Sequence, residues 1–242
     1  MARHVLAVTD STNAEAARLA PSLTSPAWIL ALRQTAARGR RGRAWAMAEG
    51  NFAATLVMHP TEPPEVVALR SFVASLALQD AFVAVTGRSA PFALKWPNDV
   101  LLNGGKVAGI LLESLGQGTR VAHLAIGIGV NLVAAPTAAE VEPGAVPPVS
   151  LLGETGMRVS PVEFLDVLAP AYAGWEARFA AEGFAPIRAA WLARAARLGQ
   201  PVTARTGNAV LQGTFETIDD TGALVLATAN GRRAVPAAEV FF

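Results

Sequence analysis

The chain has 242 residues, a length that predicts one large domain or a large domain with a small one. Charged residues make up 16% and hydrophobic residues 52%, so a disordered chain is excluded and a large core can form. Cysteine is absent and the formal net charge is +1. This excludes disulfide frameworks, thiol nucleophiles and cysteine-bound metals, and any site for a polyanion must be local.

The first half of the chain predicts a sheet with helices beside it. Residues 4–9 alternate as a strand, and Thr12-Asn-Ala-Glu15 has the pattern of a capping box for a helix to about residue 20. Gly87 should end a long apolar helix over residues 64–85. Strands are expected at residues 27–32, 52–58, 92–95, 100–103, 106–114 and 120–128. Because tight glycine turns join the last four, the sheet should be mainly antiparallel.

The second half predicts a loop, two helices and a small β domain. Residues 133–149 are rich in Ala and Pro and are expected to be a loop. Ser160-Pro-Val-Glu163 is a second capping box, which predicts a helix to about residue 181 and then another at residues 185–198. From Gly199, short strands alternate with turn signals such as Asn230-Gly231. We expect a main domain at residues 1–196 and a β-barrel at residues 197–242 that packs on it.

No membrane-spanning or secretory segment is expected. The longest uncharged run, residues 121–139, is interrupted by two glycines, Asn131 and Pro136, and is typical of a buried strand that continues into a loop. At the N-terminus only residues 5–8 are continuously apolar, short of the roughly 7 to 15 residues of a signal peptide's core. We therefore expect a cytoplasmic protein.

The basic residues are unevenly chosen. The chain has 18 arginines and only two lysines, Lys95 and Lys106, which lie in one short segment. A compact ammonium approaches a single phosphate or carboxylate oxygen differently from a planar guanidinium, so these positions are candidates for a role that arginine cannot fill. Two neighbouring surface lysines are the alternative. His4, His59 and His123 lack metal-ligand spacing and are expected to be structural.

An arginine-rich loop is the second anomaly. The segment Arg38-Gly-Arg-Arg-Gly-Arg-Ala-Trp45 lies in a stretch with no acidic residue between Glu15 and Glu49. Its two glycines disfavour a helix and let backbone N–H groups approach a ligand closely. The loop is therefore expected to bind an anion, with a solvated surface loop or an arginine–glycine contact to nucleic acid as alternatives.

Five motifs together resemble the biotin protein ligases, in the order and spacing of that family. They are Asp10-Ser-Thr-Asn13, Gln34 followed by the arginine loop, Lys95-Trp-Pro-Asn-Asp99, Lys106-Val-Ala-Gly-Ile-Leu111 and Gly127-Ile-Gly-Val-Asn131. The resemblance covers the whole chain. It implies an α+β fold with a mixed, mainly antiparallel sheet and helices packed on it, of the class II synthetase-like type, followed by an SH3-like β-barrel.

The resemblance also implies an activity: biotin and ATP form biotinyl-5'-AMP, and the biotinyl group passes to one lysine of a biotin carboxyl carrier protein. The implied biotin-binding residues are Ser11, Thr12, Asn13, Gln34, Arg38, Gly39, Arg40, Lys106, Gly109 and Gly127. The implied ATP-binding residues are Arg40, Arg41, Arg43, Trp45, Asn98, Lys106 and Asn131, and the implied catalytic residues are Lys106, Arg38, Arg40 and Asp99. Mg²⁺ would be held through the phosphates, with Asp99 steadying either the metal or a lysine.

Several of these residues have a structural alternative. The Ser11–Asn13 segment can serve only to cap a helix, and Asp99 can be a turn former. Trp96 and Pro97 are expected to pack and to orient Asn98 and Asp99. Residues 35–48 are expected to be mobile without ligand and to close over the adenylate, because a mixed anhydride must be kept from water.

The chain departs from the family pattern in places. Ala37 stands before the arginine loop where a glycine is usual, and Pro236-Ala-Ala-Glu239 lacks the glycine that normally precedes this glutamate. The sequence begins at the first catalytic strand, so no DNA-binding domain and no repressor function are expected. We expect no membrane partner, and a monomer or a homodimer.

Two competing functions remain at this point. A lipoate or octanoyl ligase would share the fold, but its usual Arg-Arg-x-x-Gly-Gly-Gly stretch is missing here. A nucleic-acid-binding protein could use the arginine loop and the barrel, but it leaves the segment from Lys95 to Ile110 unexplained.

Overall fold

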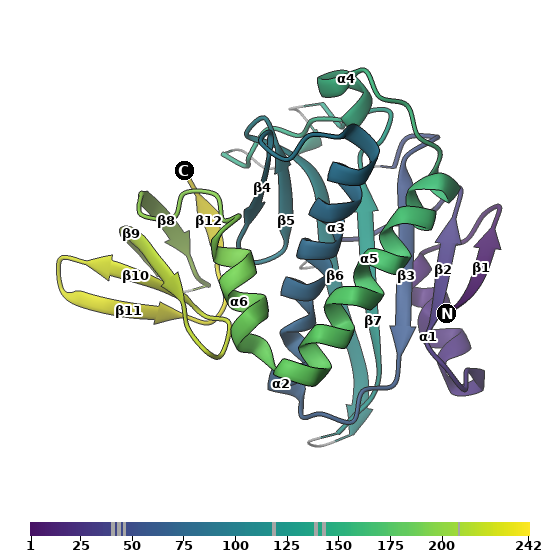
Figure 1. Cartoon of the computed structure of the whole chain (residues 1–242), viewed down its shortest axis with the longest axis horizontal. Helices are drawn as coiled ribbons and strands as arrows, with labels where there is room; N and C mark the ends of the chain where they lie inside the picture. Colours follow the sequence, from purple (N-terminus) through teal and green to yellow (C-terminus); the bar gives the residue numbers. More distant parts are fainter. Residues whose placement is uncertain are drawn as a thin grey trace.

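A seven-stranded sheet runs through the larger part of the molecule (Figure 1). The computed structural model describes the whole chain except residues 40, 41, 43, 44, 46, 118, 119, 138, 139, 142, 143 and 208. The strand order is β1-β2-β3-β7-β6-β5-β4, and only the β1–β2 pair is parallel among the described strands. The strands are β1 (Ala2–Leu6), β2 (Ala27–Ala31), β3 (Phe52–Met58), β4 (Phe92–Lys95), β5 (Asp99–Leu102), β6 (Gly105–Gln117) and β7 (Arg120–Val130). The predicted mixed, mainly antiparallel sheet is confirmed.

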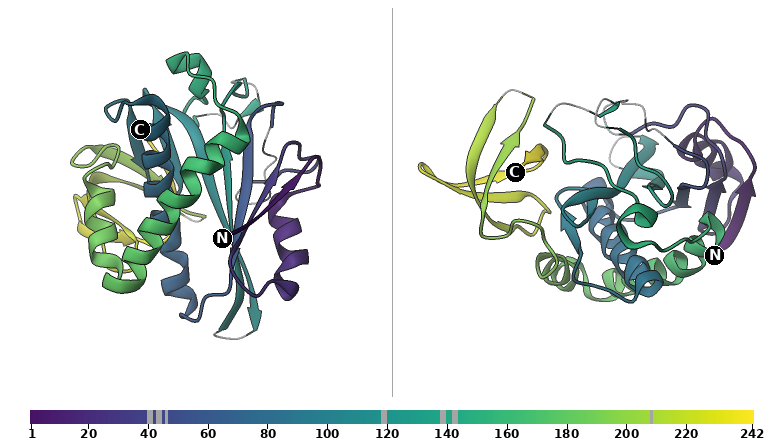
Figure 2. Two further views of the ribbon diagram at one scale, coloured as in Figure 1. Left: turned by 45° about the vertical axis from the view of Figure 1, so that its right-hand side comes forward. Right: turned by 90° about the horizontal axis from the view of Figure 1, so that it is seen from above.

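Helices cover the two faces of this sheet unequally (Figure 2). One face packs on α3 (Arg70–Thr86) and α5 (Pro161–Glu182), and the other carries α1 (Thr12–Leu19) over part of its area. The stretch Pro64–Thr86 is long and apolar enough to cross a membrane, with a mean hydropathy of 1.5, but 72% of its apolar window is buried inside the protein. It is built into the core. The remaining helices are η1 (Ala20–Ser22), α2 (Pro64–Ala68), α4 (Leu151–Thr155) and α6 (Phe184–Leu192).

The core lies between the sheet and the pair α3 and α5. Alternate residues of each strand point into it, because successive side chains of a strand point to opposite faces. Aromatic rings fill its centre, with the ring centroids of Phe82 and Phe92 5.0 Å apart and those of Phe52 and Phe164 5.2 Å apart. The largest fully buried side chains include Trp28, Trp191, Tyr172, Phe52, Phe82 and Phe164.

Helix termini differ in part from the sequence-based expectation. The capping box at Ser160 forms, and Gly87 ends α3 in the left-handed conformation at φ 68°. The expected box at Thr12 and Glu15 is wrong. Ser11 is the N-cap of α1, with no side-chain cap bond in this described segment, and Glu15 accepts from Arg18 instead.

Two helical segments are shorter than expected. The long apolar helix breaks at Leu69, where i to i+3 hydrogen bonds tighten the chain between α2 and α3. The second C-terminal helix ends at Leu192 and not near residue 198. There the chain leaves the helix to pair with β4, since Leu94 N–H donates to Arg194 C=O and Ala196 N–H donates to Leu94 C=O, both at 2.8 Å.

The C-terminal segment forms a five-stranded antiparallel sheet in the order β11-β10-β9-β8-β12. Its strands are β8 (Pro201–Arg205), β9 (Val210–Ile218), β10 (Leu224–Thr228), β11 (Gly231–Val235) and β12 (Glu239–Phe241). This sheet sits beside α6 at one end of the molecule (Figures 1 and 2). Trp191 of α6 packs on Phe215 of β9, with the ring centroids 6.4 Å apart.

Candidate active site

A cavity of about 500 Å³ opens on the sheet face opposite α3 and α5. Its wall is completed by residues of the arginine loop, of the 133–149 segment and of β12. Every predicted site residue that the structure describes lines this one cavity: Ser11, Thr12, Asn13, Gln34, Arg38, Gly39, Trp45, Asn98, Asp99, Lys106, Gly109, Gly127 and Asn131. The predicted residues Arg40, Arg41 and Arg43 lie outside the described residues.

A neutral hydrogen-bonding group forms one end of the cavity. Gln34 Oε1 accepts from the Thr12 backbone N–H at 2.7 Å and from Thr12 Oγ1 at 3.2 Å. Below them Thr55 Oγ1 lies 2.8 Å from Thr12 Oγ1 and donates to Asn13 Oδ1 at 2.6 Å. Thr12, Asn13 and Thr55 are buried, so this end offers fixed, uncharged donors and acceptors in a dry setting.

Asn13 also connects this end to charged groups. Its Nδ2 donates to Glu113 Oε2 at 2.7 Å, and the other oxygen of that carboxylate lies 3.5 Å from Arg38 Nη2. A Cβ on Gly127 would lie 2.3 Å from Asn13 Oδ1, so only a glycine on β7 leaves room for this side chain. The absence of a side chain on Gly127 therefore leaves the space that Asn13 occupies in the cavity wall.

The carboxylate of Asp10 fixes the entry to this segment. Its oxygens accept from the Ser11 backbone N–H at 2.7 Å and from Arg18 Nη2 at 2.7 Å. The hydrogen bond from Arg18 and the one from Ser11 hold the pKa of Asp10 well below its usual range. The carboxylate therefore stays ionised across the neutral pH range.

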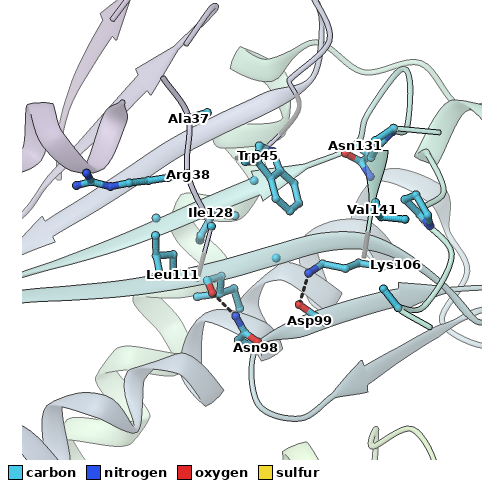
Figure 3. Close-up of a pocket in the computed structure, with 18 of the residues that line it drawn as sticks. Ala37, Arg38, Trp45, Asn98, Asp99, Lys106, Leu111, Ile128, Asn131 and Val141 are labelled. Carbon is cyan, nitrogen blue, oxygen red and sulfur yellow. Dashed lines mark hydrogen bonds and ion pairs between the residues drawn. The ribbon is translucent and has the colours of Figure 1, made fainter. Parts of the chain in front are cut away.

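A charged group lies in the middle of the cavity, where β5 and β6 meet (Figure 3). Lys106 Nζ lies 2.6 Å from Asp99 Oδ1, and Lys95 Nζ lies 3.7 Å from Asp99 Oδ2. Both predicted lysines are thus in the cavity, and Asp99 is placed against them. Of the two roles considered for Asp99, this geometry favours steadying a lysine.

A β-bulge makes this arrangement possible. Val100 pairs with Ala108 but Leu101 pairs with Lys106, so Val107 is the extra residue on β6. Lys106 and Gly109, three positions apart, would point to opposite faces of a regular strand. The bulge brings both to the cavity face and leaves Val107 in the core.

Trp45 forms the roof above Lys106 and lies between Arg38 and Asn131 (Figure 3). The Lys106 ammonium lies 5.6 Å from the centroid of the indole ring, within cation–π range. The ring rests on glycines, since a Cβ on Gly129 would lie 2.7 Å from it and one on Gly109 would lie 3.3 Å from it. Side chains at these two positions would displace the indole.

Two asparagines of the cavity wall each hold a backbone carbonyl, on opposite sides of Lys106 (Figure 3). Asn98 Nδ2 donates to Ile110 C=O at 2.5 Å, and Asn131 Nδ2 donates to Val149 C=O at 3.1 Å. Asn131 Oδ1 is buried and has no hydrogen-bond partner among the described residues. This orphaned acceptor lies where the aromatic roof and the 133–149 segment meet.

The described residues do not fit a protein-built magnesium site. No group of three or more His, Asp or Glu residues that could hold a metal occurs among them. The carboxylate of Asp99 faces ammonium groups, which compete with a cation for its oxygens. A site of this kind is compatible only with a metal carried by phosphate.

Sequence reasoning missed several residues in or behind the cavity wall: Gly129 lines the cavity, whereas Thr55 and Glu113 bond to the lining residue Asn13. Thr55 and Glu113 had only the weak signal of a polar residue inside an apolar strand, and Gly129 shares a strand face with Gly127. The C-terminal strand β12 also contributes lining residues, as does the 133–149 segment. The lining residues from these two segments are Pro136, Glu140, Val141, Ala145, Val146, Pro148, Glu239, Val240 and Phe241.

Two family profiles match the chain. The Biotin/lipoate A/B protein ligase family matches residues 5–131, and the Biotin protein ligase C terminal domain matches residues 198–242. The first region holds most of the cavity, and the second begins just before β8 and contains the whole C-terminal sheet.

Similar proteins of known name are biotin ligases. The biotin--[acetyl-CoA-carboxylase] ligase of Paracoccus denitrificans is 63% identical over 238 residues, covering 98% of this chain and 99% of that protein. The bifunctional ligase/repressor BirA of Bacillus subtilis is 30% identical over 88% of this chain and 65% of its own length. Among solved structures, the biotin protein ligase of Aquifex aeolicus in complex with biotin and ATP superposes with a TM-score of 0.84 at 26% identity, covering 99% and 97% of the two chains.

Proposed function

Since this chain belongs to the biotin/lipoate A/B protein ligase family and is an ATP-dependent biotin ligase, we propose that the cavity beside Lys106 binds both substrates, with Lys106 between them. The observation that carries the proposal is the order of groups along the cavity. A neutral hydrogen-bonding end, a lysine in the middle and an aromatic roof follow one another.

Biotin's ureido ring is neutral and needs paired donors and acceptors. Ser11, Thr12 and Gln34 supply them at the buried end, and Asn13 with Thr55 keeps Thr12 in place. We infer that the biotin carboxylate then lies toward the middle of the cavity. There Arg38, with its side chain about half exposed, Lys106 and Lys95 are positive groups of the described residues.

In the first step, a biotin carboxylate oxygen bonds to the α-phosphorus of ATP and the bond from that phosphorus to pyrophosphate breaks. Two anions must meet, so the site has to supply positive charge where negative charge develops on the phosphoryl oxygens. Lys106 is held by Asp99 for that task, and Trp45 with the orphaned acceptor of Asn131 suits an adenine ring with its amino group.

In the second step, the amine of a lysine on the carrier attacks the acyl carbon of biotinyl-AMP, and AMP leaves. We propose a biotin carboxyl carrier protein or domain of a biotin-dependent carboxylase as this acceptor. The proposal is supported by the Paracoccus relative, a biotin--[acetyl-CoA-carboxylase] ligase that matches this chain over nearly its whole length. We infer that the reaction takes place in the cytoplasm, where such carboxylases meet ATP.

The test is transfer of labelled biotin. Purified protein, ATP, Mg²⁺ and labelled biotin are mixed with a biotin carboxyl carrier domain, and label on the domain is measured with and without ATP. We expect ATP-dependent labelling of one lysine, and loss of labelling when that lysine is replaced by arginine. Equal or faster transfer of lipoate in direct competition would contradict the biotin assignment.

A further inference from the structure

The turn between β9 and β10 contacts the main domain through Gly222, which is buried. Gly222 C=O accepts a hydrogen bond from Trp96 Nε1 at 3.0 Å, and Trp96 is only 3% exposed. A Cβ on Gly222 would lie 2.9 Å from Leu69 and 3.0 Å from Phe72. The contact is therefore a close backbone approach that has no room for a side chain.

Hydrogen bonds within residues 219–223 stabilise this turn independently of the contact with Trp96. Asp219 Oδ1 accepts from the Thr221 backbone N–H at 2.9 Å, from Thr221 Oγ1 at 2.7 Å and from the Ala223 backbone N–H at 3.0 Å. Gly222 has φ +83°, a conformation that side chains disfavour, and its N–H donates to Asp219 C=O at 3.1 Å. These hydrogen bonds within the turn orient the Gly222 carbonyl toward Trp96.

Trp96 opens the turn between β4 and β5, and Asp99 closes it. Ser71 Oγ donates to Pro97 C=O at 3.1 Å and Asn98 Nδ2 donates to Ile110 C=O at 2.5 Å, so this turn is fixed on two other sides. Trp96 is the residue through which the β9–β10 turn contacts this turn. Asp99, three residues further along, lies 2.6 Å from Lys106 Nζ.

We propose that Gly222 and Trp96 are positioning residues for adenylation. The β9–β10 turn fixes the 96–99 turn through one buried hydrogen bond and so sets Asp99 against Lys106. The C-terminal sheet then takes part in the first chemical step at a distance, besides lining the cavity with β12. This inference rests on the proposed function, because it takes Lys106 to act in adenylation.

The test compares two variants that weaken the contact differently. Trp96→Phe keeps an aromatic ring and removes the N–H donor, and Gly222→Ala adds a methyl group where there is no room. In both we expect kcat for biotinyl-AMP formation to fall about tenfold, in line with the loss of one buried hydrogen bond. KM for biotin should change less than about twofold, since the ureido-binding residues lie at the other end of the cavity.

The matched control is Arg188→Gln. Arg188 of α6 pairs with Asp220 in the same turn but does not reach the 96–99 turn in the described contacts. It should keep wild-type kcat per active site, with the number of active sites counted from the first turnover of biotinyl-AMP.

Three results would overturn the proposal: unchanged kcat in Trp96→Phe, an equal loss in Arg188→Gln, or a loss only in the number of active sites. Each would mean that the turn merely docks the C-terminal sheet. If the wild-type protein makes no biotinyl-AMP, the proposed function itself is wrong. Differences among the variants test only the positioning role of Gly222 and Trp96.

Discussion

The two faces of the seven-stranded sheet are made from alternate residues of the same strands, yet they differ in size and polarity. On β7, Ile126 and Val130 belong to the core with α3 and α5, whereas Gly127 and Gly129 line the cavity. One face is filled by bulky side chains and the other is kept open by small ones. The difference teaches that stability and activity are assigned to opposite faces, so substitutions on each should have separable effects.

The largest expected effect is on the packed face. Ile126 is completely buried, and Ile126→Ala should destabilise the fold by about 2–5 kcal/mol through lost burial and the cavity left behind. Denaturant unfolding measures this change. KM for biotin should stay at the wild-type value in the folded fraction, and a raised KM would show that the two faces are coupled.

Lys106→Arg should have the largest effect on the cavity face. The ammonium fits between Asp99, Gly109 and the Trp45 ring, and a planar guanidinium is too large for that position. We expect the rate of pyrophosphate release to fall about 100-fold, or about 2.7 kcal/mol, with the midpoint of thermal unfolding little changed. Near wild-type release would mean that the scarcity of lysine in this chain has no functional meaning.

Gly127→Ala sharpens the comparison with Ile126→Ala, because both change one residue on neighbouring positions of β7. The new methyl group would meet Asn13 Oδ1 at 2.3 Å and push that side chain out of its contact with Thr55. We expect biotin affinity to weaken about tenfold, or about 1.4 kcal/mol, by calorimetric titration. A loss of stability as large as that of Ile126→Ala would argue against the division between the faces.

The smallest expected effect is a pH dependence of the free energy of unfolding, which comes from the ion pair between Glu62 and Arg70 of α3. Burial alone would raise the pKa of Glu62, but its hydrogen bond from Arg70 and its own turn hydrogen bonds outweigh burial and lower the pKa below 4.5. A lowered folded-state pKa means that the stabilisation is present above about pH 4.5 and is lost as pH falls through the folded value.

Unfolding free energy measured between pH 7 and pH 3 tests this. The acid-dependent loss from this carboxylate should be about 1 kcal/mol or less, since Glu62 is partly exposed. Glu62→Gln should flatten that part of the profile. An unchanged slope would show that Glu62 does not contribute to the acid response.

Much of the site could be predicted because its residues come in short contiguous motifs. Ser11, Thr12 and Asn13 lie on one turn, and Asn98 with Asp99 closes one hairpin, so local spacing already groups them. Thr55, Glu113 and the β12 residues could not be found this way. Thr55 and Glu113 bond to Asn13 from 42 and 100 residues away in the sequence, and only the folded sheet brings them together.

The fold shows the same limit. Strand positions followed from alternation and turn residues, and β4 was predicted at its observed bounds. The bulge at Val107, the break at Leu69 and the early end of α6 each depend on what the neighbouring element offers, such as the pairing of the chain with Leu94. The secondary-structure propensities of neighbouring residues contain no information about such tertiary contacts.

The placement of the two lysines has a practical consequence for chemical labelling. Lys95 and Lys106 are the only lysines in the sequence, and both line the cavity beside Asp99. An amine-selective reagent therefore finds no lysine of this sequence outside the cavity. Every lysine adduct then forms in the cavity. Because a bound substrate shields the cavity, the number of adducts measured by mass spectrometry of the whole protein reports how much of the site is occupied.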